Sequence, residues 1–442
     1  MVAANVKIIE ELKYFLDTIS TEEAIRELVC GQSTDFSRNR KLPLKRLVGL
    51  IINQPKRSLS VEIEAFFDHL NQGSKACTKG AFSLQRTKLR PLFFKVWNKW
   101  LADSFYHHYG SHCKRWRGFL IQAVDGSSVY LFDKPEVIEH FGTQYNQYKE
   151  TPLARVMQVH DLLNDFTQWG DIHPITQSEQ SIISRRVSQL PADSITLFDR
   201  AYPGYALMYL MMHQETCRHF VMRCKTTFSK EVKHFLGSRK RSKVILLTPE
   251  PQAIATLFAH GYMVTKQTQL KVRMVRITLP DGEPEVLLTS LCDQRFYTIQ
   301  DIYYLYGLRW GIETAYSKQK NQQQMEQFSG HRVVCIEQDY AAGLFVANLQ
   351  SLIEKQCEAY VHRISSFRKH SYRINRNVSW SALKHTIVKL FLEHDTMLTL
   401  MKLQQAFERN TEPLRPGRRY KRMVRARSKG KYQTFTNYKR AI

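Results

Sequence analysis

Short apolar segments with β-type patterning alternate with helical segments from about residue 116 to residue 225. The apolar segments are 118–132, 154–163, 166–175, 193–199 and 218–225, and the helical segments are 178–190 and 202–213. Strands that alternate with helices are typical of a mixed α/β domain built around a sheet. We therefore expect an α/β fold in this part of the chain.

The residues before this region have a different pattern. Residues 1–115 carry apolar residues at i, i+3 and i+4 spacing, which predicts mostly helix. Two helical segments, 57–70 and 78–101, are joined by a short turn that contains Gly73. This arrangement suits a helix-turn-helix, whose second helix enters the major groove of DNA. An ordinary helical hairpin with solvated lysines fits the pattern equally well.

The chain after residue 225 predicts four further parts. Residues 226–284 read as mostly strand and turn and predict a β-rich insertion, after which residues 285–355 rejoin the core begun at 116–225. Residues 356–408 predict a helical C-terminal region. The last part, 409–442, is a basic tail with eleven Lys and Arg and no acid from residue 414 onward, and such runs are usually solvated arms.

The charge of the chain points to a polyanionic partner. With 65 Lys and Arg against 40 Asp and Glu, the net charge is +25 and the isoelectric point is near 9.7. Nucleic acid is the leading candidate for such an excess, although ribosomal and membrane-surface proteins share it. The first twenty residues predict an acidic amphipathic helix and no signal peptide, and the apolar runs fall short of the roughly 20 residues that span a bilayer. The eight scattered cysteines, without a CxxC pair, predict reduced thiols of a cytosolic protein.

Four chemically different residues recur at helical spacing between residues 306 and 320. If the segment is one helix at about 100° per residue, Tyr306, Arg309, Glu313 and Lys320 project from one stripe about 60° wide. A surface helix with an Arg309–Glu313 pair explains the same pattern, and such a pair contributes only a few tenths of a kcal/mol. The spacing alone leaves both interpretations open.

Two aspartates follow apolar strand segments. Asp125 comes at the end of the run 119–124, and Asp199 comes at the end of 194–198. An aspartate at a strand end often only opens a turn or caps a helix. Together with Glu313 from a helix beside them, however, these two would form an all-oxygen site of the kind that Mg²⁺ prefers. Two such ions about 4 Å apart stabilise phosphoryl displacement.

The order and spacing of these residues resemble the bacterial insertion-sequence transposases of the DDE type, in the IS-four family. The signature Y-x(2)-R-x(3)-E-x(6)-K of that family matches Tyr306, Arg309, Glu313 and Lys320 without a gap. The segments 123–142 and 197–205 resemble the regions around its first and second aspartates. The block 151–191 and the closing 437–441 also have the family's pattern, so the resemblance covers most of the chain from about residue 20 onward.

The resemblance implies a ribonuclease-H-like catalytic core with an insertion between its second and third acids. It implies that Asp125, Asp199 and Glu313 are catalytic and hold two divalent ions, Mg²⁺ or Mn²⁺. It also implies that Arg309 and Lys320 hold a DNA phosphate, with Tyr306 packed beside it.

The expected function is that of a DNA transposase that binds the terminal inverted repeats of its element, cleaves the strands and transfers them to target DNA. We expect double-stranded DNA as the partner, a homodimer in the DNA complex, and a cytoplasmic location in a bacterium, on the nucleoid when DNA is bound. Further candidate DNA contacts are Lys79, Arg86 and Lys88 in the helix-turn-helix segment, and Arg418, Arg419, Lys421 and Arg422 in the tail.

The chain departs from the family at two places. Ala201 stands where many relatives carry glycine, and no Trp occurs between Trp169 and Trp310, where relatives that cut through a hairpin use an aromatic residue of the insertion to hold a flipped base. Candidate substitutes are Phe228, Phe235 and Tyr262. Four acids near the first motif could be mistaken for metal ligands, and we interpret them as turn or surface acids: Asp133, Asp161, Asp165 and Asp171.

Three alternatives compete with this function. A nuclease or junction resolvase could share the fold, and a domesticated DNA-binding regulator could retain it without activity. Such regulators usually lose metal-binding acids or the phosphate-binding Arg and Lys, and here the whole set is present. A basic RNA-binding structural protein would leave the ordered set of acids unexplained.

Overall fold

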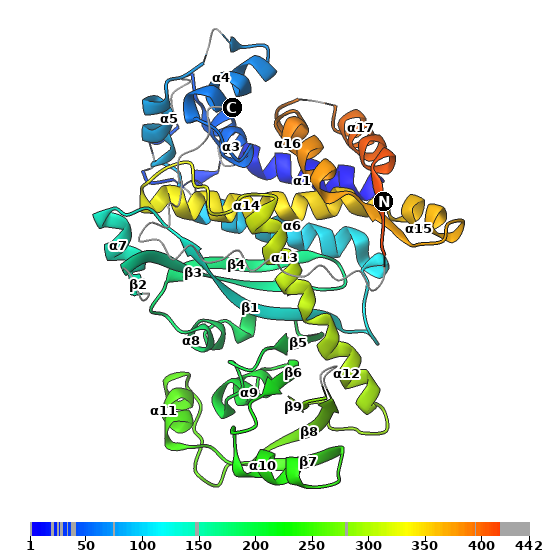
Figure 1. Cartoon of the computed structure of the whole chain (residues 1–442). Coiled ribbons are helices and arrows are strands. Elements are labelled where there is room, and N and C mark those ends of the chain that lie inside the picture. The colour runs from blue at the N-terminus through cyan, green and yellow to red at the C-terminus, as the bar shows by residue number, and fades with distance from the viewer. Residues whose placement is uncertain are drawn as a thin grey trace, which may run out of the picture.

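Helices pack against both faces of a long twisted sheet in the computed structural model of the chain (Figure 1). The structure describes residues 2–415, except 19–21, 24–25, 27–29, 33, 37–40, 74–75, 146–149, 279–281 and 394. Most of the helices from both ends of the chain gather at the top of the view, above β3 and β4. The segment between α9 and α12 extends to the bottom.

The helices of the first 115 residues are α1 (Val2–Thr18), α3 (Leu44–Ile52), α4 (Leu59–His69), α5 (Lys79–Arg86) and α6 (Leu92–Tyr109). The helices of the middle are α7 (Pro135–Phe141), α8 (Glu179–Ser184), α9 (Tyr205–Met212), α10 (Lys230–Gly237) and α11 (Pro251–Ala259). The remaining helices are α12 (Ile299–Leu308), α13 (Trp310–Asn321), α14 (Val333–Lys355), α15 (Glu358–Ser366), α16 (Arg376–Leu392) and α17 (Thr396–Arg409). Short 3₁₀ helices lie at Gly110–His112 and Val187–Gln189.

The strands are β1 (Leu120–Tyr130), β2 (Thr143–Tyr145), β3 (Glu150–Asp161), β4 (Phe166–Pro174), β5 (Ser194–Phe198), β6 (His219–Cys224), β7 (Ser242–Leu247), β8 (Leu270–Thr278), β9 (Pro284–Thr289), β10 (Tyr372–Ile374) and β11 (Thr411–Pro413). Within the described chain, β1 to β9 form one sheet, and β10 and β11 form a separate pair.

The first part of the sheet has the topology of a ribonuclease-H-like fold. Its strands lie in the order β4-β3-β1-β5-β6. The pairs β4–β3 and β3–β1 are antiparallel, and the pairs β1–β5 and β5–β6 are parallel. Parallel neighbours need a crossover, and α8 and α9 are the helices that connect β4 to β5 and β5 to β6. The expected fold class is confirmed.

The segment 226–284 continues the same sheet. It forms α10, β7, α11 and β8, and β9 then pairs antiparallel with both β8 and β6. The two helices differ from the mostly strand and turn content that the sequence predicts. Val232 and Phe235 of α10 and Leu257 of α11 are buried in the core on this side of the sheet, so packing stabilises these short helices.

The helices from the two ends of the chain share one hydrophobic core. Buried residues of α1, α3, α4, α5 and α6 form a single cluster with those of α14, α16 and α17. Trp97 of α6 stacks on Phe345 of α14, with ring centroids 4.0 Å apart. The regions 1–115 and 356–408, which the sequence separates by more than 200 residues, are therefore built as one helical body.

Two local predictions were wrong. The segment 78–101 is not one helix: α5 ends at Arg86 and α6 begins at Leu92, because Pro91 lacks an N–H and disfavours helix in the residue before it. Asp125 also does not end a strand as predicted, because β1 runs straight through Asp125 and Gly126. Residues on both sides keep their pairing with β3, and this ladder outweighs the turn propensity of the dipeptide.

No helix in the described part of the chain has both the length and the hydropathy required to cross a bilayer. All eight cysteines lie in that part, and they are free thiols.

Candidate active site

Asp125 and Asp199 come from neighbouring parallel strands at matching positions. Ala123 of β1 pairs with Leu197 of β5, and each aspartate follows two residues later, Asp199 directly after the strand ends. Since side chains on a strand repeat with a period of two, the two carboxyl groups fall on the same side of the sheet at the same level. Asp125 therefore lies within its strand, not at the strand end that the sequence predicts.

The environment of Asp125 disfavours its negative charge. The pKa of its carboxyl group is raised to about 7, first because burial removes the group from water. Arg309 opposes this effect, while the negative charges of Asp199 and Glu179 add to it. The two aspartates and Glu179 thus lie close enough to interact electrostatically.

Helix α13 brings Glu313 to the same strand. Tyr316, one turn further along α13, is buried and donates its hydroxyl hydrogen bond to the carbonyl oxygen of Asp125 at 2.9 Å. Glu313 accepts a hydrogen bond from Arg309 Nη2 at 2.7 Å. Arg309 also faces the charge of Asp125, so its guanidinium is the positive charge between the acids.

The three candidate acids do not form a closed cage in this arrangement. Across the described ranges, no group of three or more His, Cys, Asp or Glu side chains is placed to hold a metal ion. Glu313 forms an ion pair with Arg309, whose Nη2 lies 2.7 Å from Glu313 Oε1.

Tyr306 and Arg309 carry hydrogen-bond donors that are not used. Tyr306 is 9% exposed and Arg309 is 7% exposed, yet the Tyr306 hydroxyl and Arg309 Nε have no partner among the described residues. The Arg309 guanidinium lies over the Tyr306 ring, 5.9 Å from its centroid. Buried donors without partners are costly, and a ligand that accepts hydrogen bonds would remove that cost.

Lys320 lies apart from this group. Its ammonium donates to the carbonyl oxygen of Ser128 at 2.7 Å, three residues beyond Asp125 on β1. Burial lowers the pKa of Lys320. The segment 306–320 is also not one uninterrupted helix, since Arg309 lies between α12 and α13. The backbone of Arg309 itself is helical, with φ −51° and ψ −33°. Helices α12 and α13 therefore follow one another directly alongside the sheet (Figure 1).

The site contains a fourth acid, Glu179, which the sequence motifs do not predict. It begins α8, accepts a hydrogen bond from the Tyr202 hydroxyl at 2.7 Å and pairs with Arg155 of β3. Its carboxyl carbon lies only 2.4 Å from where a Cβ atom at Gly126 would be. The only sequence signal for Glu179 is its place within the block 151–191 that resembles the transposase family.

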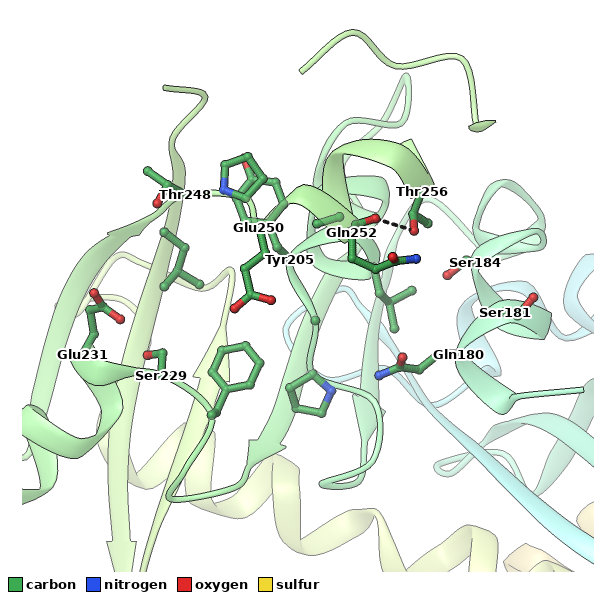
Figure 2. A pocket seen from close by; sticks show the side chains of 18 of the residues that line it. Gln180, Ser181, Ser184, Tyr205, Ser229, Glu231, Thr248, Glu250, Gln252 and Thr256 are labelled. Carbon is green, nitrogen blue, oxygen red and sulfur yellow. Dashed lines mark hydrogen bonds between the residues drawn. The ribbon is translucent and has the colours of Figure 1, made fainter. Parts of the chain in front are cut away.

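A groove lies next to the chain segment that follows Asp199. Its volume is about 1140 Å³, and it is lined by residues of α8 and α9 on one side and of α10, β7 and α11 on the other. Figure 2 shows Gln180, Ser181 and Ser184 facing Ser229, Glu231 and Glu250 across it. Lys230 and Lys233 also line the groove, so its charge is mixed.

The candidate DNA contacts of the first helices have different environments. Lys79 is exposed, whereas Lys88 pairs with Asp35 at 3.5 Å. Arg86 was predicted as a DNA contact, and this prediction is wrong: the side chain is 1% exposed and forms an ion pair with Asp339 at 2.9 Å. The tail residues Arg418, Arg419, Lys421 and Arg422 lie outside the described residues.

The acids near the first motif are only partly surface acids. Asp133 is exposed, as expected. Asp161, the last residue of β3, is fully buried and accepts hydrogen bonds from Tyr106 and Asn164. Asp171 is 6% exposed and pairs with Lys95 at 2.7 Å.

Asp165 lies in the turn between β3 and β4, with a left-handed φ of 53°. It pairs with Arg376 at 2.7 Å and with Lys318 at 3.7 Å. Asp165 and Asp171 are thus paired with cations from distant parts of the sequence. Local sequence patterns do not reveal such pairs.

Of the aromatic residues considered for holding a flipped base, Phe235 is 1% exposed and Tyr262 packs edge-on against Tyr209. Phe228 is half-buried and lines the groove. Burial therefore excludes Phe235 from that role in this conformation.

Comparison with known proteins identifies what this chain is similar to. The family model described as "Transposase DDE domain" matches residues 106–349. The putative transposase InsZ of Escherichia coli (strain K12) is 32% identical over 116 residues, which are 24% of this chain and about a third (37%) of that protein. The transposase InsG for insertion sequence element IS4, from the same organism, is 22% identical over 342 residues, which are 74% of this chain and 73% of that protein.

Among solved structures, a piggyBac transposase synaptic complex with hairpin DNA aligns over 93% of this chain and 84% of that chain. The TM-score is 0.41 and the sequence identity is 13%.

Proposed function

This chain belongs to the DDE transposase family, whose domain spans more than half of it, and we propose that it mobilises its own insertion sequence by cleavage and strand transfer. In this proposal it binds the terminal inverted repeats of the element as a homodimer and hydrolyses the strand at each end. It then directs the freed 3′ hydroxyl onto target DNA. We also propose that it acts in the bacterial cytoplasm, where it is nucleoid-associated while DNA is bound.

The observation that carries the proposal is the placement of Asp125 and Asp199. They lie at one level on adjacent parallel strands, with α13 and its Glu313 packed over the first of them. This topology brings carboxylates from two strands and one helix to an acidic centre at the middle of the sheet.

The residues at this centre suit the divalent metal that the family uses. The donors are carboxylate oxygens, which hard cations such as Mg²⁺ or Mn²⁺ prefer. Burial raises the pKa of Asp125, and the charges of Asp199 and Glu179 raise it further against the effect of Arg309, so a bound cation would stabilise its carboxylate. We propose that Asp125, Asp199 and Glu313 hold two ions, which when bound provide positive charge for phosphoryl transfer.

We propose that Tyr306 and Arg309 bind the phosphate next to the bond that is cut. Their unpaired Tyr306 hydroxyl and Arg309 Nε are suited to donate hydrogen bonds to a phosphate oxygen, and an arginine also supplies a permanent positive charge. When Arg309 binds phosphate, Glu313 is released from its ion pair. Lys320, about two turns further along α13, would hold the strand as it continues past Ser128.

Sequence-specific binding of the element ends is assigned in this proposal to the first helices and the basic tail. The net charge of +25 favours association with DNA of any sequence, so it supports binding but not the choice of the inverted repeats.

The test uses labelled DNA carrying the two ends of the flanking element, with Mg²⁺. We expect wild-type protein to cut both ends at matching repeats. Asp125→Asn, Asp199→Asn and Glu313→Gln should each lose cleavage by at least about 100-fold while they retain DNA affinity, because only the acidic centre changes. A chelator should likewise abolish cleavage and leave binding.

Glu139→Gln is the matched control, because Glu139 is an exposed acid outside the site. Normal cleavage by any of the three site variants would refute the assignment of these acids. Binding without cleavage by the wild type would favour a regulator, and cleavage of branched DNA without end preference would favour a resolvase.

A further inference from the structure

A second cleft joins the first helices to the catalytic core. It has a volume of about 1000 Å³ and lies between the starts of α4 and α5 on one side and two core segments, 132–134 and 328–335, on the other. Phe132 and Phe328 are buried and form part of its floor. The cleft is thus a site to which both parts of the molecule contribute.

The charged side chains in this cleft are mostly positive. Lys79, Lys134 and Arg332 line it and are exposed, and none of the three forms an ion pair with another described residue. The acid that lines the cleft is Asp133. In the groove beside Asp199, by contrast, Glu231 and Glu250 balance the lysines.

The two walls of the cleft are held together by the buried side chain of Arg86. From α5 it donates to Gln338 Oε1 of α14 at 2.8 Å and pairs with Asp339 at 2.9 Å. It also donates to Ser329, which lines the cleft. This buried network connects α5 to α14 and to Ser329, so the two walls of the cleft are joined through Arg86.

The distance from the acidic centre to the cleft can be estimated along strand β1. Strand β1 connects them, since Asp125 is on β1 and Phe132 lies just past its end. Seven residues of extended strand correspond to about 23 Å. Along the axis of a DNA duplex, which rises about 3.4 Å per base pair, this length corresponds to about seven base pairs.

We propose that this cleft, which we call the Lys79–Arg332 cleft, binds the phosphate backbone of the element end about seven base pairs from the cut. Lys79, Lys134 and Arg332 neutralise the phosphates, and the rigid Arg86 link sets the spacing between this contact and the acids. The proposal rests on the proposed function, because it assumes that DNA is cut at Asp125, Asp199 and Glu313.

The experiment measures DNA affinity against salt concentration. The triple variant K79A/K134A/R332A is compared with wild type on an end-containing duplex between about 50 and 200 mM salt. Each lost phosphate contact should reduce the slope of log K against log salt by about 0.9, so we expect a reduction of about 2 to 3. The control K266A/K369A/K402A removes three exposed cations that lie outside the first helices, the basic tail and the cleft, and it should leave the slope unchanged.

A second readout tests the position. Ethylation of phosphates about seven base pairs from the cut should weaken binding of the wild type but not of the triple variant. Circular dichroism and thermal melting establish that the triple variant is folded, which we expect because its three residues are exposed.

The outcomes are distinguishable. An equal slope for the triple variant and wild type, with normal cleavage by both, overturns the cleft proposal and leaves the proposed function intact. An equal loss of slope in the control shows a general charge effect and also overturns it. If wild type binds the ends but never cuts them, the proposed function fails, while a loss of slope in the triple variant alone still supports the cleft as a DNA contact.

Discussion

Gly126 is the residue at which the acidic centre has the least space. A Cβ atom there would lie 2.4 Å from Glu179, which is held by Tyr202 and Arg155 and cannot move away easily. We expect Gly126→Ala to destabilise the protein by about 1 to 3 kcal/mol through overpacking. It should also slow cleavage, because the adjacent Asp125 must shift.

Chemical denaturation and single-turnover cleavage measure these two effects. Gly237→Ala is the control, since a Cβ atom there meets nothing within 4 Å. If Gly126→Ala matched this control in both measurements, Glu179 would not be packed against β1 as described.

Arg86 illustrates how burial changes the role of a residue. In the sequence, Arg86 is one of several cations in the segment predicted to contact DNA, and its positive charge is the reason for that prediction. In the structure it is 1% exposed and connects α5 to α14. Its contribution is therefore to the geometry of the Lys79–Arg332 cleft, and the exposed Lys79 is the cation of α5 that a phosphate can reach.

Among the helices, α13 is the one that determines the position of Glu313. Its polar contact with β1 beneath the acids is the Tyr316 hydroxyl, which donates to the carbonyl oxygen of Asp125 and, at 3.4 Å, to that of Val156. We expect Tyr316→Phe to cost about 1 kcal/mol of stability. Cleavage at saturating DNA should slow while DNA affinity is unchanged, because α13 loses its fixed position over the strand.

The comparison variant is Tyr304→Phe, on α12, whose side chain is 51% exposed. Cleavage by Tyr316→Phe at the rate of this comparison variant would show that packing alone positions α13. An unfolding experiment on both variants separates lost stability from lost positioning.

At the scale of the whole molecule, the helical body depends on both ends of the chain. The core of residues 1–115 is completed by α14, α16 and α17, so this region exposes large apolar faces when it is alone. We expect a fragment of residues 1–115 to lack cooperative thermal unfolding and to bind a hydrophobic dye, unlike the full chain. A sharp melting transition of the isolated fragment would contradict this expectation and would establish an autonomous domain.

The fold class and the family could both be predicted from the amino-acid sequence. Both depend on local signals: alternating strands and helices, and residue types at set spacings such as Tyr306 to Lys320. These signals survive without knowledge of distant contacts because periodicity and spacing are properties of neighbouring residues. The identities of the candidate acids Asp125, Asp199 and Glu313 could be proposed in the same way.

The environments of these residues, in contrast, depend on contacts that form when the chain folds. Pairing with β3 keeps Asp125 inside a strand, the fold brings Glu179 to Gly126, and α14 buries Arg86. Each of these outcomes depends on a partner that is distant in the sequence or on the shape of the packed fold. Local propensity does not contain that information, because burial and strand pairing are decided by the residues that a segment meets after folding.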